Sequence, residues 1–403
     1  MNWIVQLFTE HSVAHSLVVI TLIIAVGLTL SHIKLGHINL GVTWILFAGI
    51  AAGQMGLTID AQTALFVKEF GLILFIYSIG IEVGPRFFAA FRSGGLLLNG
   101  LAALIVVMGC AITLLIGHLT HTSPVAMVGV LYGAATNTPG LGAAQQTFAD
   151  LSNGETNVLF AQGYAVAYPL GVIGIILSIT LLRIFFRIDI DRENALYRKN
   201  ADRNGINLQR RLDSEMGEKT HQPNLFFIFI GIMLGVILGV LPLKVPGIAM
   251  PIKIGLAGGP LIVSILLTYF GPKLHINTYT TESANLMIRQ IGISMFMAAV
   301  GLGAGQGFIQ AIVNGGYLWV IYGVVITMVP LLLVGAIARW GCKLSYFTIA
   351  GLISGATTDP PALAYSNDIC GGSQASIAYT TVYPLSMFLR VLTAQLMVLL
   401  TCV

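Results

Sequence analysis

The chain carries the same polar, proline-containing interruption twice, inside two apolar stretches that would otherwise each form a membrane helix. Residues 135–139 read Ala-Thr-Asn-Thr-Pro, and residues 356–360, 221 positions later, read Ala-Thr-Thr-Asp-Pro. A second shared string, Tyr-Pro-Leu, follows at 168–170 and again at 383–385. Interrupted apolar segments at corresponding places in two halves are a strong sequence indication of a transporter's binding site. In hydrocarbon such a break persists only where protein or a water-filled cavity covers it.

The composition indicates an integral membrane protein built of helices. Of the 403 residues, 56% are hydrophobic and 9% are charged, whereas charged residues make up about 25% of a soluble domain. The apolar runs are continuous over roughly 20 residues, which suits membrane helices and not the short alternating segments of a β-barrel. No motif indicates a cofactor, a metal site or a nucleic-acid partner, so we expect none of these.

Six apolar segments precede a polar stretch and six follow it. We therefore predict a first membrane repeat at 1–186, a polar linker at 187–222 and a second membrane repeat at 223–403. The linker has eight Lys or Arg and seven Asp or Glu, so we expect it to be solvated and cytoplasmic. The expected apolar segments lie near 13–33, 41–58, 64–84, 94–117, 124–149, 157–186, 223–242, 253–271, 285–308, 315–338, 345–367 and 376–402.

The relation between the halves follows from the positive charges. Further matches at the 221-residue offset place Lys68 opposite Arg289 and Gly80 opposite Gly301. If 124–149 and 345–367 are re-entrant hairpins, each half has five spans, and an odd number makes the halves inverted. This arrangement places most Lys and Arg on the linker's side and both termini outside. The sequence thus predicts an all-α membrane protein of two inverted repeats, each with about five spans and a re-entrant hairpin.

The first interruption has the chemistry of an anion site. Pro139 cannot donate to a helix ladder and Gly140 relaxes the backbone, while Thr136, Asn137 and Thr138 add hydroxyl and amide groups. A helix that starts after the turn presents about half a positive charge, which favours a carboxylate. The alternative is a proline-kinked helix whose polar side chains satisfy local carbonyls. Recurrence of the motif in both halves favours the binding site.

The second interruption contains Thr357, Thr358, Asp359 and Pro360, and so adds a carboxylate. The 221-residue offset places Asp359 opposite Thr138. An acid at membrane depth costs roughly 2.5–3.5 kcal/mol on insertion scales, so it is expected to be paired, bound to a cation or protonated. Three roles remain open for Asp359: carrying a coupling proton, contacting a substrate ammonium group, or capping the following helix.

Arg390 lies well inside the last apolar segment and breaks the symmetry of the repeat, because its counterpart is Ile175. Its planar fork of donors suits a substrate carboxylate. The alternative is a structural pair with Asp359 or another acid.

Two further patterns favour structural roles. Glu82 and Arg86 are four residues apart and are interpreted as an ion pair along one helix. The stripe of Gly231, Gly235 and Gly239 marks close helix packing, either within the chain or between subunits.

These strings resemble the aspartate:alanine exchanger family. The resemblance rests on Gly-Ala-Ala-Thr-Asn-Thr-Pro-Gly-Leu at 133–141, Gly-Ala-Thr-Thr-Asp-Pro-Pro-Ala-Leu at 355–363 and the Tyr-Pro-Leu strings. It implies a homodimeric exchanger of small anions, such as aspartate or succinate, in the lipid of the bacterial inner membrane. Family members usually carry two ligand-binding domains between the halves, for which 187–222 is too short, so regulation by cytosolic ligands is not carried over.

We therefore expect a secondary active transporter for small carboxylates, with an elevator-like movement suggested by analogy. The alternative is a proton-coupled exporter or uptake system without obligatory exchange. An intramembrane aspartyl protease needs two facing acids, which Asp359 lacks, so we do not expect an enzyme. The residues expected to bind substrate are Thr136, Asn137, Thr138, Pro139, Gly140, Thr357, Thr358, Asp359, Pro360 and Arg390, with Asp359 also the candidate for coupling.

Overall fold

In the residues that it describes, the computed structural model is helical apart from one short pair of strands and the connecting turns. It describes residues 12–32, 34–35, 38–39, 41–87, 95–152, 154–155, 157–190, 192–193, 224–242, 254–274, 280–370 and 374–402. Strands β1 (Lys34–Leu35) and β2 (Ile38–Asn39) have two residues each and pair antiparallel.

The described helices follow the same order in the two halves. The first half contains α2 (Val13–Leu30), α3 (Thr43–Gln54), α4 (Ala61–Phe87), α5 (Gly95–Thr120), α6 (Pro124–Ala134), α7 (Thr138–Leu151) and α8 (Leu159–Phe185). The second contains α11 (Leu225–Val240), α12 (Gly255–Phe270), α13 (Glu282–Gly305), α15 (Tyr317–Trp340), α16 (Tyr346–Ala356), α17 (Pro360–Cys370) and α18 (Gln374–Thr401). The short elements are η2 (Pro272–Leu274), α14 (Phe308–Ala311) and the π-turn η3 (Ile312–Gly316).

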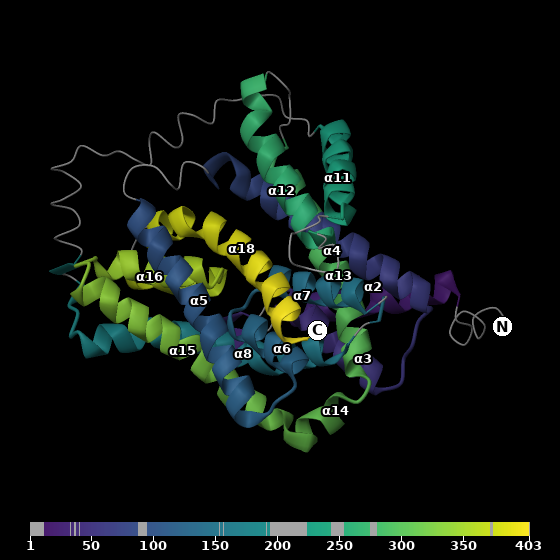
Figure 1. The fold of residues 1–403 in the computed structure, drawn as a ribbon, viewed down its shortest axis with the longest axis horizontal. Coiled ribbons are helices and arrows are strands. Elements are labelled where there is room, and N and C mark those ends of the chain that lie inside the picture. Colours follow the sequence, from purple (N-terminus) through teal and green to yellow (C-terminus); the bar gives the residue numbers. More distant parts are fainter. Residues whose placement is uncertain are drawn as a thin grey trace.

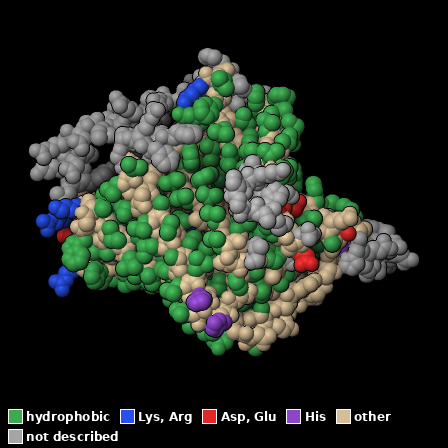
Figure 2. All heavy atoms as spheres, in the orientation of Figure 1, with side chains coloured by type: hydrophobic (Ala, Val, Ile, Leu, Met, Phe, Trp, Pro, Cys, Tyr) green, Lys and Arg blue, Asp and Glu red, His purple; other side chains and the backbone are tan. Residues whose placement is uncertain are grey.

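Seven of the described helices are long and apolar enough to cross a membrane. They are α2, α4, α5, α8, α13, α15 with the preceding α14 and η3, and α18. The other three expected spans correspond to the shorter apolar helices α3, α11 and α12. Hydrophobic side chains cover much of the face in Figure 2; Lys and Arg side chains lie at its left and upper edges, and a few acidic side chains lie on its right side. This multi-pass, lipid-facing helical architecture is the one that the apolar runs predict.

The helices pack into two bundles, each of which takes helices from both halves (Figure 1). The first bundle is α2, α3 and α4 with α11, α12 and α13. The second bundle is α5, α6, α7 and α8 with α15, α16, α17 and α18. Contacts are extensive within each bundle and sparser between them, where α7 touches α12 and α18 touches α4.

Two glycines set the centre of the first bundle, where α4 crosses α13. A Cβ added to Gly71 would lie 2.8 Å from the Gly292 carbonyl oxygen, and one added to Gly292 would lie 2.7 Å from the Gly71 oxygen. Further along α4, Ser78 Oγ donates to the Asn285 carbonyl and Asn285 Nδ2 donates to the Ser78 carbonyl, at 2.9 and 3.0 Å. From Gly71 to Ser78 the residue numbers rise along α4, while those of their partners fall from Gly292 to Asn285 along α13. These two helices therefore run antiparallel.

The glycine stripe of α11 packs within the chain. A Cβ on Gly231 would meet the Tyr77 ring, one on Gly235 would meet Pro260, and one on Gly239 would meet Gly255. Of the two alternatives left open by the sequence, the structure therefore shows intramolecular packing.

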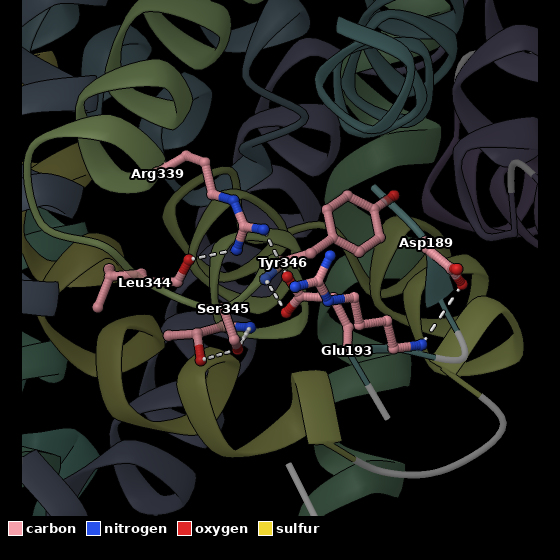
Figure 3. A network of polar contacts seen from close by, with 8 residues as sticks. Asp189, Glu193, Arg339, Leu344, Ser345 and Tyr346 are labelled. Atoms are coloured by element: carbon pink, nitrogen blue, oxygen red, sulfur yellow. Dashed lines mark hydrogen bonds and ion pairs between the residues drawn. The ribbon is translucent and has the colours of Figure 1, made fainter. Parts of the chain in front are cut away.

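The start of the polar linker is docked on the second bundle (Figure 3). Glu193 is buried; its Oε1 accepts from Arg339 Nη2 at 2.5 Å and its Oε2 accepts from the Tyr346 backbone N–H at 3.2 Å. Arg339 Nη1 also donates to the Leu344 carbonyl at 3.0 Å. The expectation of a solvated linker is thus wrong at Glu193, because its carboxylate satisfies an N–H at the first turn of α16 and a cation beside it. Residues 194–223, and Arg92, Lys244 and Lys253 on which the predicted topology partly rests, lie outside the described residues.

Candidate functional site

Each interrupted stretch consists of two helices joined by a short turn, and both turns use one hydrogen-bond pattern. We call α6–α7 the first broken segment and α16–α17 the second. The Asn137 and Thr136 N–H groups donate to the carbonyls of Tyr132 and Gly133, both at 2.9 Å. In the second turn Asp359 and Thr358 donate to the Ser354 and Gly355 carbonyls at 2.9 and 3.1 Å. Both helices therefore end in a Schellman motif.

The left-handed residue of each motif is a threonine. Thr136 has φ of 52° and Thr358 has φ of 57°, a conformation that costs a non-glycine residue roughly 1–2 kcal/mol. Backbone strain of this kind is concentrated at functional sites.

These turns correct the register of the repeat by one residue. Because the left-handed residues correspond, Thr136 is equivalent to Thr358 and Asn137 to Asp359, an offset of 222 residues. The expected equivalence of Asp359 with Thr138 is therefore wrong. It came from aligning Pro139 with Pro360, whereas the turn aligns Pro139 with Pro361.

The equivalent residues Asn137 and Asp359 both cap the helix that follows. Asn137 Oδ1 accepts from the Gly140 N–H at 2.7 Å, and the Asp359 carboxylate accepts from the Ala362 N–H. Asp359 is 1% exposed, and its Oδ2 has no hydrogen-bond partner. Asp359 therefore caps α17, which is one of the three roles left open by the sequence. Its Oδ2 is not used in this cap and stays buried without a hydrogen-bond partner.

The two turns meet each other in the protein interior. Thr136 Oγ1 donates to the Thr357 carbonyl at 3.1 Å, and Asn137 Nδ2 donates to Thr358 Oγ1 at 3.0 Å. Asn137 Nδ2 also contacts Met387 Sδ on α18 at 3.6 Å. All four turn residues are buried, so the structure brings together the parts of the two motifs that the sequence predicts to meet.

The remaining predicted residues surround the turns. Thr138 Oγ1 is 2.9 Å from the Tyr164 hydroxyl. Pro139 and Gly140 form the buried first turn of α7, where a Cβ on Gly140 would lie 2.2 Å from the Tyr132 ring. Pro360 begins α17 and is exposed, and it makes none of the contacts between the two turns.

Arg390 binds the carbonyl end of α16 and not an acid. Its Nε and Nη2 donate to the Ala356 carbonyl oxygen at 2.9 and 2.7 Å, and the side chain is buried. Among the described residues the ion pairs are Glu82–Arg289 and Glu193–Arg339, so the alternative of an Arg390–Asp359 pair is not what the structure shows. The guanidinium opposes the negative end of the α16 dipole, and its hydrogen bonds to described residues are made by Nε and Nη2.

Thr327 supports the end of α6, and the sequence analysis did not single it out. Its Oγ1 donates at 2.8 Å to the carbonyl of Ala134, which is the repeat counterpart of Ala356. The carbonyl of the last residue of α6 thus accepts from a neutral hydroxyl, whereas the carbonyl of the last residue of α16 accepts from a cation. A hydroxyl three residues before Pro330, inside an apolar helix, was the available signal.

A small cavity lies beside Arg390, between α5, α6 and α15. Its volume is about 20 Å³, and Arg390, Thr327, Thr357 and apolar side chains line it. This is room for about one water molecule, so a larger ligand enters this cavity only if the helices move.

Glu82 has a partner that the sequence analysis did not predict. It pairs with Arg289 of α13, across the two halves, and the side chain of Arg86, its expected partner, lies outside the described residues. The antiparallel crossing of α4 and α13 brings the two charges together, which spacing along one helix does not reveal.

Comparison with known proteins agrees with this architecture. A family model, Asp-Al_Ex, described as a predicted permease membrane region, matches residues 19–184 and 227–399. The chain belongs to the aspartate:alanine exchanger family. An uncharacterized transporter of Bacteroides fragilis is 39% identical over 96% of both chains, and one of Bacteroides thetaiotaomicron is 36% identical over 99% of this chain and 100% of its own. No solved structure matches the chain.

The alignments show a difference in length within the family. The alignment with the Bacteroides fragilis relative runs over 542 positions, whereas this chain has 403 residues. That relative therefore carries residues without a counterpart here. The two segments matched by the family model flank the polar linker.

Proposed function

We propose that this permease is a secondary active exchanger of small carboxylates, such as aspartate or C4-dicarboxylates. The observation that carries the proposal is the buried junction of the two broken segments. Helix ends, hydroxyls, Asp359 and Arg390 converge there in a protein otherwise covered by apolar surface. Arg390 Nη1 is placed for a substrate carboxylate, and the helix N-termini after Asn137 and Asp359 favour an anion.

The antiparallel crossing of α4 and α13 supports inverted repeats. Gly71 and Gly292 are equivalent in the 221-residue repeat, and each meets the carbonyl of the other. Equivalent helices that run in opposite directions are what inverted halves require. With the linker cytoplasmic, we place both termini outside a bacterial inner membrane.

The division into two bundles supports an elevator mechanism. Both broken segments belong to the second bundle, whereas α4 and α13 belong to the first. Movement of the second bundle against the first would carry the junction between the two faces of the membrane. We propose a homodimer in which the first bundle supplies the fixed contact.

Exchange is tested in proteoliposomes. Labelled succinate or aspartate is supplied outside, and the unlabelled acid is present or absent inside. The proposal predicts rapid uptake only when internal substrate is present. Equal uptake into empty and loaded vesicles, without a pH gradient, contradicts obligatory exchange.

The alternative is proton-coupled transport, which the unpartnered Oδ2 of Asp359 favours. A buried carboxylate without a counter-charge binds a proton readily. Uptake into empty vesicles that is driven by an imposed pH gradient and abolished by a protonophore supports this alternative over exchange.

A further inference from the structure

The Glu82–Arg289 ion pair lies at a border of the helical core, away from the broken-segment turns. Glu82 is five residues before the end of α4 and Arg289 is seven residues after the start of α13, so both lie within about 10 Å of a helix end. Their side chains are 47% and 29% exposed. Charged side chains near a membrane face water or protein and not lipid, which indicates a hydrated opening where these two helices meet.

One face of α18 leads inward from this ion pair to the turns. Tyr379 and Tyr383 stack with ring centroids 5.2 Å apart, and both lie within electrostatic range of Glu82 and Arg289. Tyr379 is also within range of Asp359. Met387 and Arg390 follow on the same face and contact Asn137 and Ala356. Helical rise places Tyr379 about 16 Å from Arg390.

The corresponding position in the other half is more closed. Tyr164, the counterpart of Tyr379 in the shared string, is fully buried against Thr138, whereas Tyr379 is half-buried. Of these two equivalent tyrosines, Tyr379 is therefore the one with more exposed surface. We call Glu82, Arg289, Tyr379 and Tyr383 the mouth.

We propose that Arg289 is an outer recognition residue for the carboxylate substrate, with Glu82 occupying its guanidinium until the substrate arrives. An entering carboxylate replaces Glu82 on Arg289, passes over the two tyrosines and reaches the turns. The pair joins helices of the first bundle while the tyrosines belong to the second, so the mouth lies where the two bundles separate. This inference rests on the proposed transport of carboxylates.

The test measures the KM for labelled succinate separately from each face, in vesicles of known orientation. Arg289→Ala is expected to raise KM on the order of tenfold from the face at which α13 begins, because a charged hydrogen bond is lost, and to change it less than about twofold from the other face. Glu82→Gln removes the competing carboxylate and is expected to lower KM from that same face. Lys273→Ala removes a cation that stacks on Tyr269, outside the mouth, and is the control.

The inference is supported if, on the same face, Arg289→Ala raises KM and Glu82→Gln lowers it. If the ion pair were only structural, both substitutions would break it and would change KM in the same direction. Equal shifts on both faces, or a rise in KM for Glu82→Gln, overturn it. If Arg289→Ala does not fold, Arg289→Lys is measured in its place. Lysine keeps the charge but loses the bidentate geometry, so KM is expected to rise. An unchanged KM in Arg289→Lys also overturns the inference. A wild-type protein that carries no carboxylate from either face defeats the proposed function itself, and the inference with it.

Discussion

Asp359 and Asn137 show at the scale of single residues how the two halves differ. Both cap a helix from the same turn, yet the amide of Asn137 satisfies all its nearby groups while Asp359 keeps a buried oxygen without a partner. Thr327 and Arg390 differ in the same way at the two carbonyl ends. All the charge at the junction therefore belongs to the second half.

Replacing Asp359 separates its capping role from its charge. Asparagine caps a helix about as well as aspartate, so Asp359→Asn is expected to keep the wild-type Tm in detergent and to lose most transport. Asp359→Ala is expected to lose transport and also about 1 kcal/mol of stability. Wild-type uptake and pH dependence in the Asn variant would leave capping as the role of this residue.

Replacing Arg390 tests whether its charge binds substrate. Arg390→Ala is expected to abolish carboxylate uptake while folded protein stays in the membrane, with a loss of about 1–3 kcal/mol because the Ala356 carbonyl loses its partner. Thr327→Val is the matched control, since it frees the equivalent Ala134 carbonyl without removing a charge. It is expected to lower Tm and retain uptake. Loss of uptake in both variants would assign Arg390 to helix capping alone.

At the scale of elements, the broken segments and the α4–α13 crossing depend on backbone geometry. A Schellman end followed at once by an N-cap lets each broken segment turn within two residues, so that helix ends and not side-chain surfaces face the junction. Apart from Pro124, every residue of α6 is buried, which gives the first turn a fixed support.

The crossing is expected to be intolerant of a single methyl group. In Gly292→Ala the Cβ would lie 2.6 Å from the Phe75 backbone nitrogen, so α4 and α13 must separate, at a cost of about 1–3 kcal/mol. Gly303→Ala in the same helix meets nothing within 4 Å and is expected to be neutral or to stabilise by up to about 1 kcal/mol. Thermal unfolding in detergent compares them, and equal Tm values would contradict the tight crossing.

At the scale of the whole molecule, the two bundles make a mechanical prediction. α4 touches α18 across the bundles through the rings of Phe87 and Phe388, whose centroids are 5.9 Å apart. Ser78 and Asn285 join α4 to α13 within the first bundle. If the second bundle moves as a body, only the first of these contacts changes during transport.

Cross-linking tests this movement. The native cysteines are first replaced, and a short bifunctional thiol reagent then joins Phe87→Cys to Phe388→Cys or Ser78→Cys to Asn285→Cys. We expect the first cross-link to stop exchange and the second to leave it unchanged relative to the same variant before treatment. Exchange that continues with α4 fixed to α18 would rule out the elevator movement.

The sequence alone determined the helical membrane class, the positions of the apolar segments and the two interruptions, because continuous apolar runs and a proline-containing break are local properties of a chain. Each expected segment corresponds to a helix or a broken pair within a few residues. The polar residues of the motifs were likewise visible before their contacts.

Only the tertiary structure decided which residues meet. The one-residue shift that aligns Asn137 with Asp359, the Arg390 contact with Ala356 and the Glu82–Arg289 pair all depend on where distant helices cross. Neither repeat spacing nor helical periodicity encodes a partner on another helix, whether it is 34 residues away, as for Arg390 and Ala356, or 207, as for Glu82 and Arg289. Such pairings arise when buried polar groups take the partners that close packing brings within reach.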